Sequence, residues 1–412
     1  MSEAEVVTRR ANPVPAHVPP EAVFAFDFHN DPGFRANPQK RWDEIRAQRR
    51  VFYTPLPRHP ATGAAGDWVF THAEDIRRIL QDPETFRSGG TRAMGKMVGD
   101  SWKLVPTDMD PPEHGHFRTL MNPIFSPKRM AALEVKVRER ARELIAPLAT
   151  QKGCEFIHAF ARAFPVSIFL ELMGLPLDRI DELVEIEEGI LHPKDGSQVE
   201  SVRRLRDYLR NEIEDRRKTP TDDLISFAVQ AQVDGRPCTP DEVMGICFML
   251  FIGGLDTVTS TLSYVFKHLA QNPENQAKLR ARPELIPDAV EELIRAHSVV
   301  TTGRLVAKDV EVAGMQLKAG DYVSMPMTSA SRDPDEFAHP AEIDFERPSN
   351  RHAAFGYGPH RCIGSHLARR EAVIALEEWL KAIPAFRLKH GAELISDGAG
   401  VMSLQALPLE WD

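Results

Sequence analysis

The segment FGYGPHRCIG occupies residues 355–364 and leads into a run of good helix formers, and it decides the fold of this chain. It places one cysteine, Cys362, on a loop with three glycines, Gly356, Gly358 and Gly364, which allow the backbone to turn tightly. Backbone N–H groups at the start of a helix stabilise negative charge, so the loop favours a thiolate. A lone thiolate of this kind suits a soft ligand on one face of a metal. The alternative is a buried, inert cysteine beside a loop.

The composition is that of a large globular protein. The chain has 412 residues, of which 42% are hydrophobic and 27% charged. Lys and Arg number 51 against 60 Asp and Glu, and the resulting net charge of −9 argues against a nucleic-acid partner. Four scattered cysteines share no metal-ligand spacing with one another and fit a reducing cytoplasm better than a disulfide framework: Cys154, Cys238, Cys247 and Cys362.

The N-terminal residues predict an irregular arm. Residues 1–20 contain Arg9, Arg10 and several prolines but no apolar run, so we expect neither a signal peptide nor a membrane anchor. The most apolar stretch, Val243 to Leu255, has 13 residues, which is too short to span a bilayer and predicts a buried core helix. We therefore expect residues 21–412 to form a single domain in the cytoplasm, without a membrane.

Apolar periodicity predicts a chain dominated by helices. Helices are expected over about 40–50, 73–81, 128–149, 158–173, 200–217, 222–233, 240–270, 287–297 and 364–381. A strand pair is expected around 51–53 and 68–70, short hairpins between 303 and 326, and a last strand over 401–407. The glycine-rich segment 87–104 predicts a mobile loop.

A second unusual pattern lies in the middle of the long apolar helix. The residues are Gly253, Gly254, Leu255, Asp256 and Thr257. Each glycine costs about 1 kcal/mol in a helix interior, and an unpaired aspartate costs more. Missing Cβ atoms leave a groove for a small molecule, and a carboxylate beside a hydroxyl can relay protons to it. The alternative is a helix-packing notch with a salt-bridged aspartate.

Two further pairs have helical spacing. Glu292 and Arg295 lie three residues apart and can form an ordinary surface ion pair. His114 and Arg118 follow Pro111 and Pro112, which can begin a helix, so they face the same way and can clamp an anion.

The 355–364 segment resembles the haem-binding loop of the cytochrome P-450 family, Phe-Gly-x-Gly-x-His-x-Cys-x-Gly, at every fixed position. The resemblance implies a mainly α cytochrome P-450 fold, with a helical haem domain and a small β-rich region. It implies haem b as cofactor, with Cys362 as the iron ligand. It places Phe355 and Gly364 beside the sulfur, and makes Glu292, Arg295 and Arg347 a fold-maintaining triad.

The same resemblance gives roles to the other motifs. Gly253 and Gly254 belong to the oxygen-binding motif, in which Thr257 hydrogen-bonds the activated oxygen and Asp256 brings protons from solvent. The haem propionates are expected to be held by four basic residues: His114, Arg118, Arg304 and His360.

The likeness is greatest to the bacterial camphor hydroxylases. Where those enzymes hold camphor's ketone with a tyrosine, this chain has Trp102, and Thr302 replaces an aspartate near the propionates. The inferred pocket is almost wholly apolar and consists of Trp102, Leu104, Thr107, Met249, Ile252, Val300, Val401 and Met402. Such a pocket suits a compact terpenoid or norisoprenoid rather than camphor itself. Plain core packing is the alternative for most of these side chains.

The reaction implied is hydroxylation of an unactivated C–H bond with O2, by a monomer that receives two electrons from a [2Fe–2S] ferredoxin and its flavin reductase. Six arginines lie near the motifs: Arg118, Arg347, Arg351, Arg361, Arg369 and Arg370. They suggest a docking surface for an acidic electron carrier. The alternative is that they simply pair with local carboxylates. A peroxide-dependent haem-thiolate enzyme and a non-catalytic haem sensor or carrier are the alternative functions.

Overall fold

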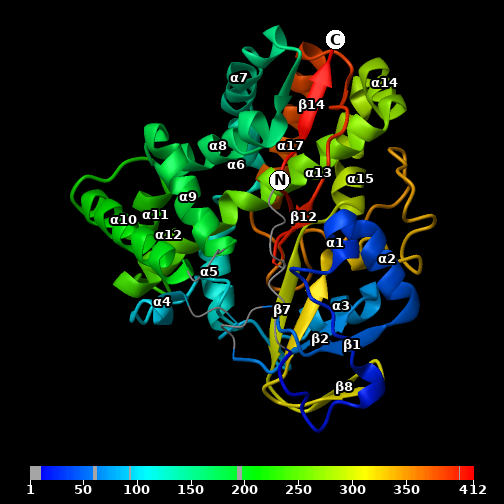
Figure 1. Ribbon diagram of the computed structural model, residues 1–412. Helices are drawn as coiled ribbons and strands as arrows, with labels where there is room; N and C mark the ends of the chain where they lie inside the picture. The colour runs from blue at the N-terminus through cyan, green and yellow to red at the C-terminus, as the bar shows by residue number, and fades with distance from the viewer. Residues whose placement is uncertain (1–10, 59–62, 92–93, 193–196, 399) are drawn as a thin grey trace. The chain divides into compact units, whose positions relative to one another are not determined.

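A computed structural model describes residues 11–58, 63–91, 94–192, 197–398 and 400–412 (Figure 1). Contacts between residues group the chain into two compact units, each made of several chain segments. The sheet unit comprises Met1–Thr91, Glu292–Arg361 and Glu393–Gln405. The helical unit comprises Arg92–Glu291, Cys362–Ala392 and Ala406–Asp412. The single domain expected after residue 20 stays a prediction.

The sheet unit is built on a five-stranded sheet of order β1-β2-β10-β7-β3. Only the β10–β2 pair is parallel in this sheet. Its strands are β1 (Val51–Thr54), β2 (Asp67–Phe70), β3 (Phe86–Arg87), β7 (Thr301–Val306) and β10 (Tyr322–Pro326). All side chains of β1, β2 and β10 are buried, so these strands form the core of the unit rather than an exposed edge.

Short elements complete the sheet unit. Two small hairpins are formed by β8 (Val310–Val312) with β9 (Met315–Leu317), and by β12 (Ser396–Asp397) with β13 (Ser403–Leu404). The helices are α1 (Pro32–Ala36), α2 (Pro38–Gln48), α3 (Ala73–Gln81) and α16 (Met327–Ala330), with a 3₁₀ turn at Pro20–Ala22. Helix α15 (Ile286–Ala296) begins in the helical unit and ends in the sheet unit.

The helical unit contains most of the helices (Figure 1). They are α4 (Met94–Met97), α5 (Glu113–Met121), α6 (Pro127–Ala132), α7 (Glu134–Ile145), α8 (Ala163–Met173), α9 (Ile180–Leu191), α10 (Gln198–Lys218), α11 (Leu224–Gln230), α12 (Pro240–Gly254), α13 (Asp256–Gln271), α14 (Pro273–Ala281) and α17 (Ser365–Ala382). Short strands are β4 (Gly153–Glu155), β11 (Phe386–Leu388) and β14 (Pro408–Trp411) in one sheet, and the hairpin of β5 (Gln232–Val233) with β6 (Arg236–Pro237).

Helix α12 forms the centre of the helical unit's core. It starts with a capping box in which Thr239 and Glu242 exchange hydrogen bonds, and nine of its residues are buried. The chain then breaks at Leu255, whose φ of −102° and ψ of −58° separate α12 from α13. Thr259 and Thr261 return their hydroxyls to the carbonyls of Leu255 and Thr257, a pattern that bends helices.

Most of the predicted elements are present. Helix α3 covers the predicted 73–81, and β1 and β2 form the predicted strand pair. Several expectations are wrong in detail. The helix expected over 222–233 ends at Gln230 and is followed by β5. The 240–270 helix is two helices, the 128–149 helix is divided into α6 and α7, and the 401–407 strand is reduced to β13 with a bridge from Val401 to Val300. The 87–104 segment, predicted to be a loop, contains the short helix α4.

The stretch Pro240–Gln271 is long and apolar enough to cross a membrane by length and composition. However, 72% of its most apolar window is buried inside the protein. A core helix has the same properties, as the sequence predicted for this region.

Candidate active site

The cysteine loop has the backbone that its glycines predict. Gly356 and Gly358 both have a φ of +70°, in the left-handed region that favours glycine. A Cβ at Gly358 would lie 2.2 Å from the carbonyl oxygen of Leu80, so this position admits no other residue without a shift of backbone. Cys362 itself is exposed, just before α17, and a Cβ on Gly364 would lie 4.0 Å from its Sγ. The alternative of a buried cysteine is therefore wrong.

The predicted propionate ligands come from both units. In the helical unit, His114 and Arg118 lie one turn apart on α5, with His114 only 2% exposed and Arg118 donating to Asn122. In the sheet unit, Arg304 is a buried residue of β7 that donates to the carbonyl of Gly303 at 2.7 Å. Phe355 stacks at 5.8 Å on His352. It stays a prediction that the three basic residues and His360 bind the haem propionates.

The two glycines of α12 have different surroundings. A Cβ on Gly254 would lie 2.5 Å from ring carbons of Phe169 on α8, so this glycine permits close helix packing. Gly253 is exposed on an otherwise buried helix, and a Cβ there would meet only the end of Met249, at 2.9 Å. The predicted groove for a small molecule therefore fits Gly253, whereas for Gly254 the packing notch is the correct explanation.

Asp256 opens α13 at the helix break, and it is paired. His192, which follows α9, places Nε2 3.0 Å from Asp256 Oδ2. Ser260 Oγ is 3.5 Å from the other carboxylate oxygen. The sequence predicted that a tolerated aspartate would need a partner. It did not identify His192, because the two residues are 64 positions apart.

Trp102 is held in the helical unit by a ring contact and by a hydrogen bond from its indole N–H. It is 5% exposed, with its ring 4.6 Å from that of Phe248 on α12. The indole N–H is donated to Asp100 Oδ2 at 2.9 Å and is therefore already occupied within the protein. A Cβ on Gly245 would lie 2.0 Å from the carbonyl oxygen of Lys103, which explains how this segment lies directly on the α12 backbone.

The other predicted pocket residues fall into two groups. In the helical unit, Leu104 and Ile252 are buried and belong to the same apolar cluster, against which Met249 packs. Thr107 is half-buried. In the sheet unit, Val300 forms a β-bridge with Val401, and the N–H of Met402 donates to the carbonyl of Val299 at 2.8 Å. Each group is thus assembled within its own unit.

The glutamate–arginine triad is fully formed in the sheet unit. Glu292 and Arg295 are joined at 2.7 Å with side chains 1% and 0% exposed, and Arg347 Nε lies 3.1 Å from Glu292. Arg295 also donates to the carbonyls of Ser331 and Pro340. The surface-pair interpretation is wrong, because the whole group is buried.

Several of the supposed docking arginines are engaged by carboxylates. Arg347 is part of the buried triad, Arg369 pairs with Glu291 at 2.6 Å, and Arg370 pairs with Glu134. Arg351 and Arg361 are exposed. The interpretation of these arginines as partners of local carboxylates is therefore correct for three of them.

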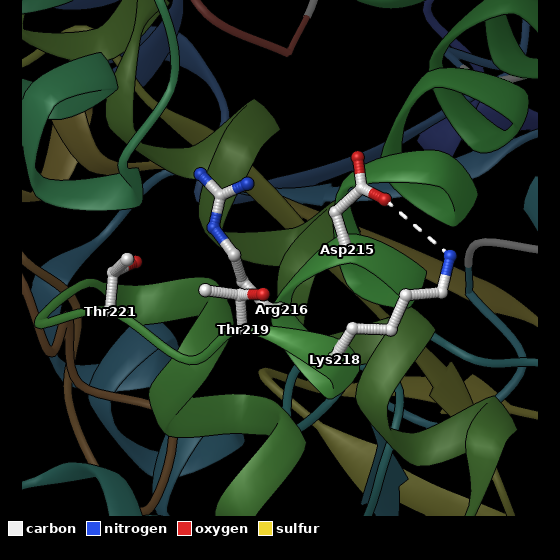
Figure 2. A pocket seen from close by; sticks show the side chains of 5 residues that line it. All are labelled: Asp215, Arg216, Lys218, Thr219 and Thr221. Carbon is white, nitrogen blue, oxygen red and sulfur yellow. Dashed lines mark ion pairs between the residues drawn. The ribbon is translucent and has the colours of Figure 1, made fainter.

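Two surface hollows occur in the helical unit. One, of about 380 Å³, lies at the C-terminal end of α10 and is lined by Asp215, Arg216, Lys218, Thr219 and Thr221 (Figure 2). Asp215 and Lys218 form a solvent-exposed ion pair at 3.8 Å, so this hollow is a solvated surface feature. The other, of about 510 Å³, includes Trp102, Met244 and the Arg210 and Arg217 side chains of α10.

Comparison with known proteins gives the family. The model of the Cytochrome P450 family matches residues 179–394. A probable cytochrome P450 127A1 of Sinorhizobium fredii is 40% identical over the whole of both chains. Pentalenic acid synthase of Streptomyces avermitilis is 31% identical, with 91% of this chain and 94% of the relative covered.

Solved structures agree with this result. CYP101J2 has a TM-score of 0.86 at 34% identity, covering 97% of this chain and 99% of the other. CYP101C1 has the same score and identity, covering 97% and 100%. The chain belongs to the cytochrome P450 family, with the expected mainly α fold. It is an oxidoreductase that incorporates molecular oxygen and uses haem b.

The residues present fit a haem. Among the described residues, no group of three His, Cys, Asp or Glu side chains is arranged to hold a metal. The exposed Sγ of Cys362 offers a single sulfur donor, which suits a metal whose other ligands come from a macrocycle. Gly253, exposed on a buried helix, provides a surface without a side chain on which a flat ring can lie.

Proposed function

We propose that this cytochrome P450 hydroxylates a compact, apolar terpenoid or norisoprenoid, with Cys362 as the iron ligand and Asp256 and Thr257 supplying protons. The observation that supports this proposal is the break at Leu255. It sets a paired carboxylate and a hydroxyl at the start of α13, a few residues after the exposed Gly253 at the end of the mostly apolar α12. When bound, the haem supplies the activation of O2. The protein's own residues exclude water, orient the substrate and move protons.

The substrate class is supported by the lining of the predicted pocket. Leu104, Ile252 and Met249 offer only apolar surface, and the Trp102 N–H donates its hydrogen bond to Asp100. The pocket is therefore expected to recognise its substrate by shape and apolar contact, with little selection for a polar group on the substrate. A panel of monoterpenes and ionones, scored by the low-spin to high-spin shift of the haem, tests this assignment. Binding of polar ligands alone would contradict it.

We propose that the two electrons come from a [2Fe–2S] ferredoxin with its flavin reductase, and that the enzyme acts as a cytoplasmic monomer. Three of the six arginines are engaged by carboxylates. We propose that the exposed Arg351 and Arg361 attract an acidic carrier. NADH-driven product formation that depends on ferredoxin distinguishes this enzyme from a peroxide user, and product formation itself distinguishes it from a haem sensor or carrier.

The proton-transfer role of Thr257 predicts a specific defect. A Thr257→Ala protein is expected to bind haem and substrate normally, while the yield of product per NADH falls about tenfold and peroxide accumulates, because the hydroxyl no longer passes a proton to oxygen. Thr261→Ala is the matched control, since its hydroxyl is bound to the carbonyl of Thr257 and points along the helix. Unchanged product yield in Thr257→Ala would contradict the proposed function.

Trp102 provides a test of the pocket. In Trp102→Phe the ring stack on Phe248 is kept but the hydrogen bond to Asp100 is lost, at a cost of about 1 kcal/mol. Asp100 also lies 3.6 Å from Arg206 and 3.7 Å from Arg210 of α10, so the change loosens the link between this segment and α10. We expect substrate affinity to fall about fivefold or regioselectivity to change, with haem content unaltered.

Trp42→Phe is the control for that change. Trp42 is fully buried in the sheet unit, and its indole N–H has no hydrogen-bond partner among the described residues. Its replacement therefore removes an indole without removing a hydrogen bond. Equal effects of the two changes on substrate binding would show that Trp102 does not belong to the pocket.

A further inference from the structure

A cluster of three titratable side chains connects the helix break to the surface of the helical unit. His192 Nε2 and Asp256 Oδ2 are 3.0 Å apart. Glu187, one turn before His192 on α9, receives a hydrogen bond from the backbone N–H of Asp256. Its Oε1 has no hydrogen-bond partner within the part of the chain that the structure describes. Of these three residues, only Asp256 belongs to the motif recognised in the sequence.

Exposure decreases in order along this cluster. The His192 side chain keeps 26% of its accessible surface, Asp256 keeps 12%, and Glu187 is 5% exposed. The imidazole is therefore the member of the cluster that is most accessible to solvent. Glu187 lies on the inner side of Asp256, away from solvent.

Charged groups act on the inner member of the cluster. Burial, and then the neighbouring Asp256 carboxylate, raise the pKa of Glu187 well above its usual value. Among described residues, Arg162, next to the start of α8, and Glu188 on α9 also act on Glu187. These two form an ion pair with each other. From α10, Gln198 contributes an uncharged amide to the carbonyl of Ile190.

We infer that His192 is the proton entry residue of this enzyme, passing protons from solvent to Asp256 for the reduction of oxygen. This inference rests on the proposed function, because it gives Asp256 its source of protons. In each transfer the Nε2–H bond of the imidazolium breaks and an O–H bond forms on Asp256 Oδ2. The imidazole then regains a proton from water. No electrons are exchanged in this step.

A histidine at this position has a chemical consequence. Histidine is the side chain whose unperturbed pKa, about 6.5, allows it both to accept and to release protons near neutral pH. An arginine would pair with Asp256 equally well but would stay protonated. The relay therefore requires a protonated His192, and oxygen consumption should slow as pH rises through the range in which His192 loses its proton.

The deciding experiment compares His192→Arg with the unaltered holoenzyme. Arginine keeps a positive charge against Asp256, so a purely structural role of His192 is preserved. We expect ferredoxin-driven oxygen consumption to fall about tenfold and to lose its dependence on pH between 6 and 9, with the ferrous carbonyl spectrum unchanged. His192→Gln, which also cannot supply a proton, is expected to behave in the same way. An unaltered rate and pH profile in His192→Arg would overturn the relay.

A second measurement does not depend on turnover. In the diamagnetic ferrous carbonyl protein, NMR of labelled histidine identifies His192 by the signal that His192→Gln removes. We expect the signal of this imidazole to change with pH, with a midpoint that moves in Asp256→Asn. A midpoint that does not respond to Asp256 would overturn the inference. If Thr257→Ala uncouples turnover but His192→Arg changes nothing, only the relay fails. If Thr257→Ala has no effect, the proposed function fails.

Discussion

A Cys362→Ser protein is expected to fold but to lose the spectral signature of thiolate ligation, with product formation below about 1% of the unaltered enzyme. Cys362 is exposed at the start of α17, so replacing its sulfur with oxygen removes no core packing. A serine hydroxyl stays protonated at neutral pH and donates far less electron density to iron than a thiolate does. The measurement is the position of the Soret band of the reduced protein under CO, together with product yield.

Cys238→Ser is the control for Cys362→Ser. Cys238 is half-buried next to β6, and burial raises the pKa of its thiol, so it remains a neutral thiol. We expect its replacement to leave both the carbonyl spectrum and product yield unchanged. A red-shifted Soret band that survives in Cys362→Ser would show that another residue holds the iron.

Glu292→Gln is expected to destabilise the protein by about 3–5 kcal/mol, because it leaves two buried guanidinium groups without their carboxylate. Glu292 is bound by Arg295 and Arg347 and receives a further hydrogen bond from Asn350. A loss of this size is a large part of the roughly 5–15 kcal/mol that holds a typical domain folded. The midpoint of urea unfolding and the yield of haem-loaded protein measure it.

The preceding residue provides a matched control. Glu291 forms an ion pair with Arg369 at 2.6 Å, but both side chains keep more than a quarter of their surface exposed. Exposed pairs contribute about 0–1 kcal/mol, so Glu291→Gln should move the unfolding midpoint little. If the two changes have equal effects, the burial of the triad does not determine its contribution to stability.

Local patterns in the sequence were enough to predict the elements that depend on nearby residues. Helix α3 matches its predicted bounds, since its apolar residues Ile76, Ile79 and Leu80 recur at helical spacing. Helix α9 was not predicted, although Leu183, Ile186 and Ile190 are buried on one face and carry the same signal. The break at Leu255 was missed because buried apolar residues recur at helical spacing again from Val258 onward.

Contacts between distant residues could not be predicted from one sequence. The sequence indicated that Asp256 needs a partner, but many residues could have satisfied that need, and only the fold selects His192. In the same way, Trp102 offered an indole N–H, and only the path of the chain gives that N–H to Asp100. The family could be predicted from the cysteine loop, because its motif consists of nearly consecutive residues.

The close approach at Gly245 has an evolutionary consequence. The Lys103 carbonyl lies where any larger residue at position 245 would place its first side-chain carbon. Substitutions at position 245 are therefore not tolerated unless residues 103–105 move away from α12. A descendant of this enzyme that acquires a new substrate will more readily change the side chains of Trp102 or Leu104 than the backbone that carries them.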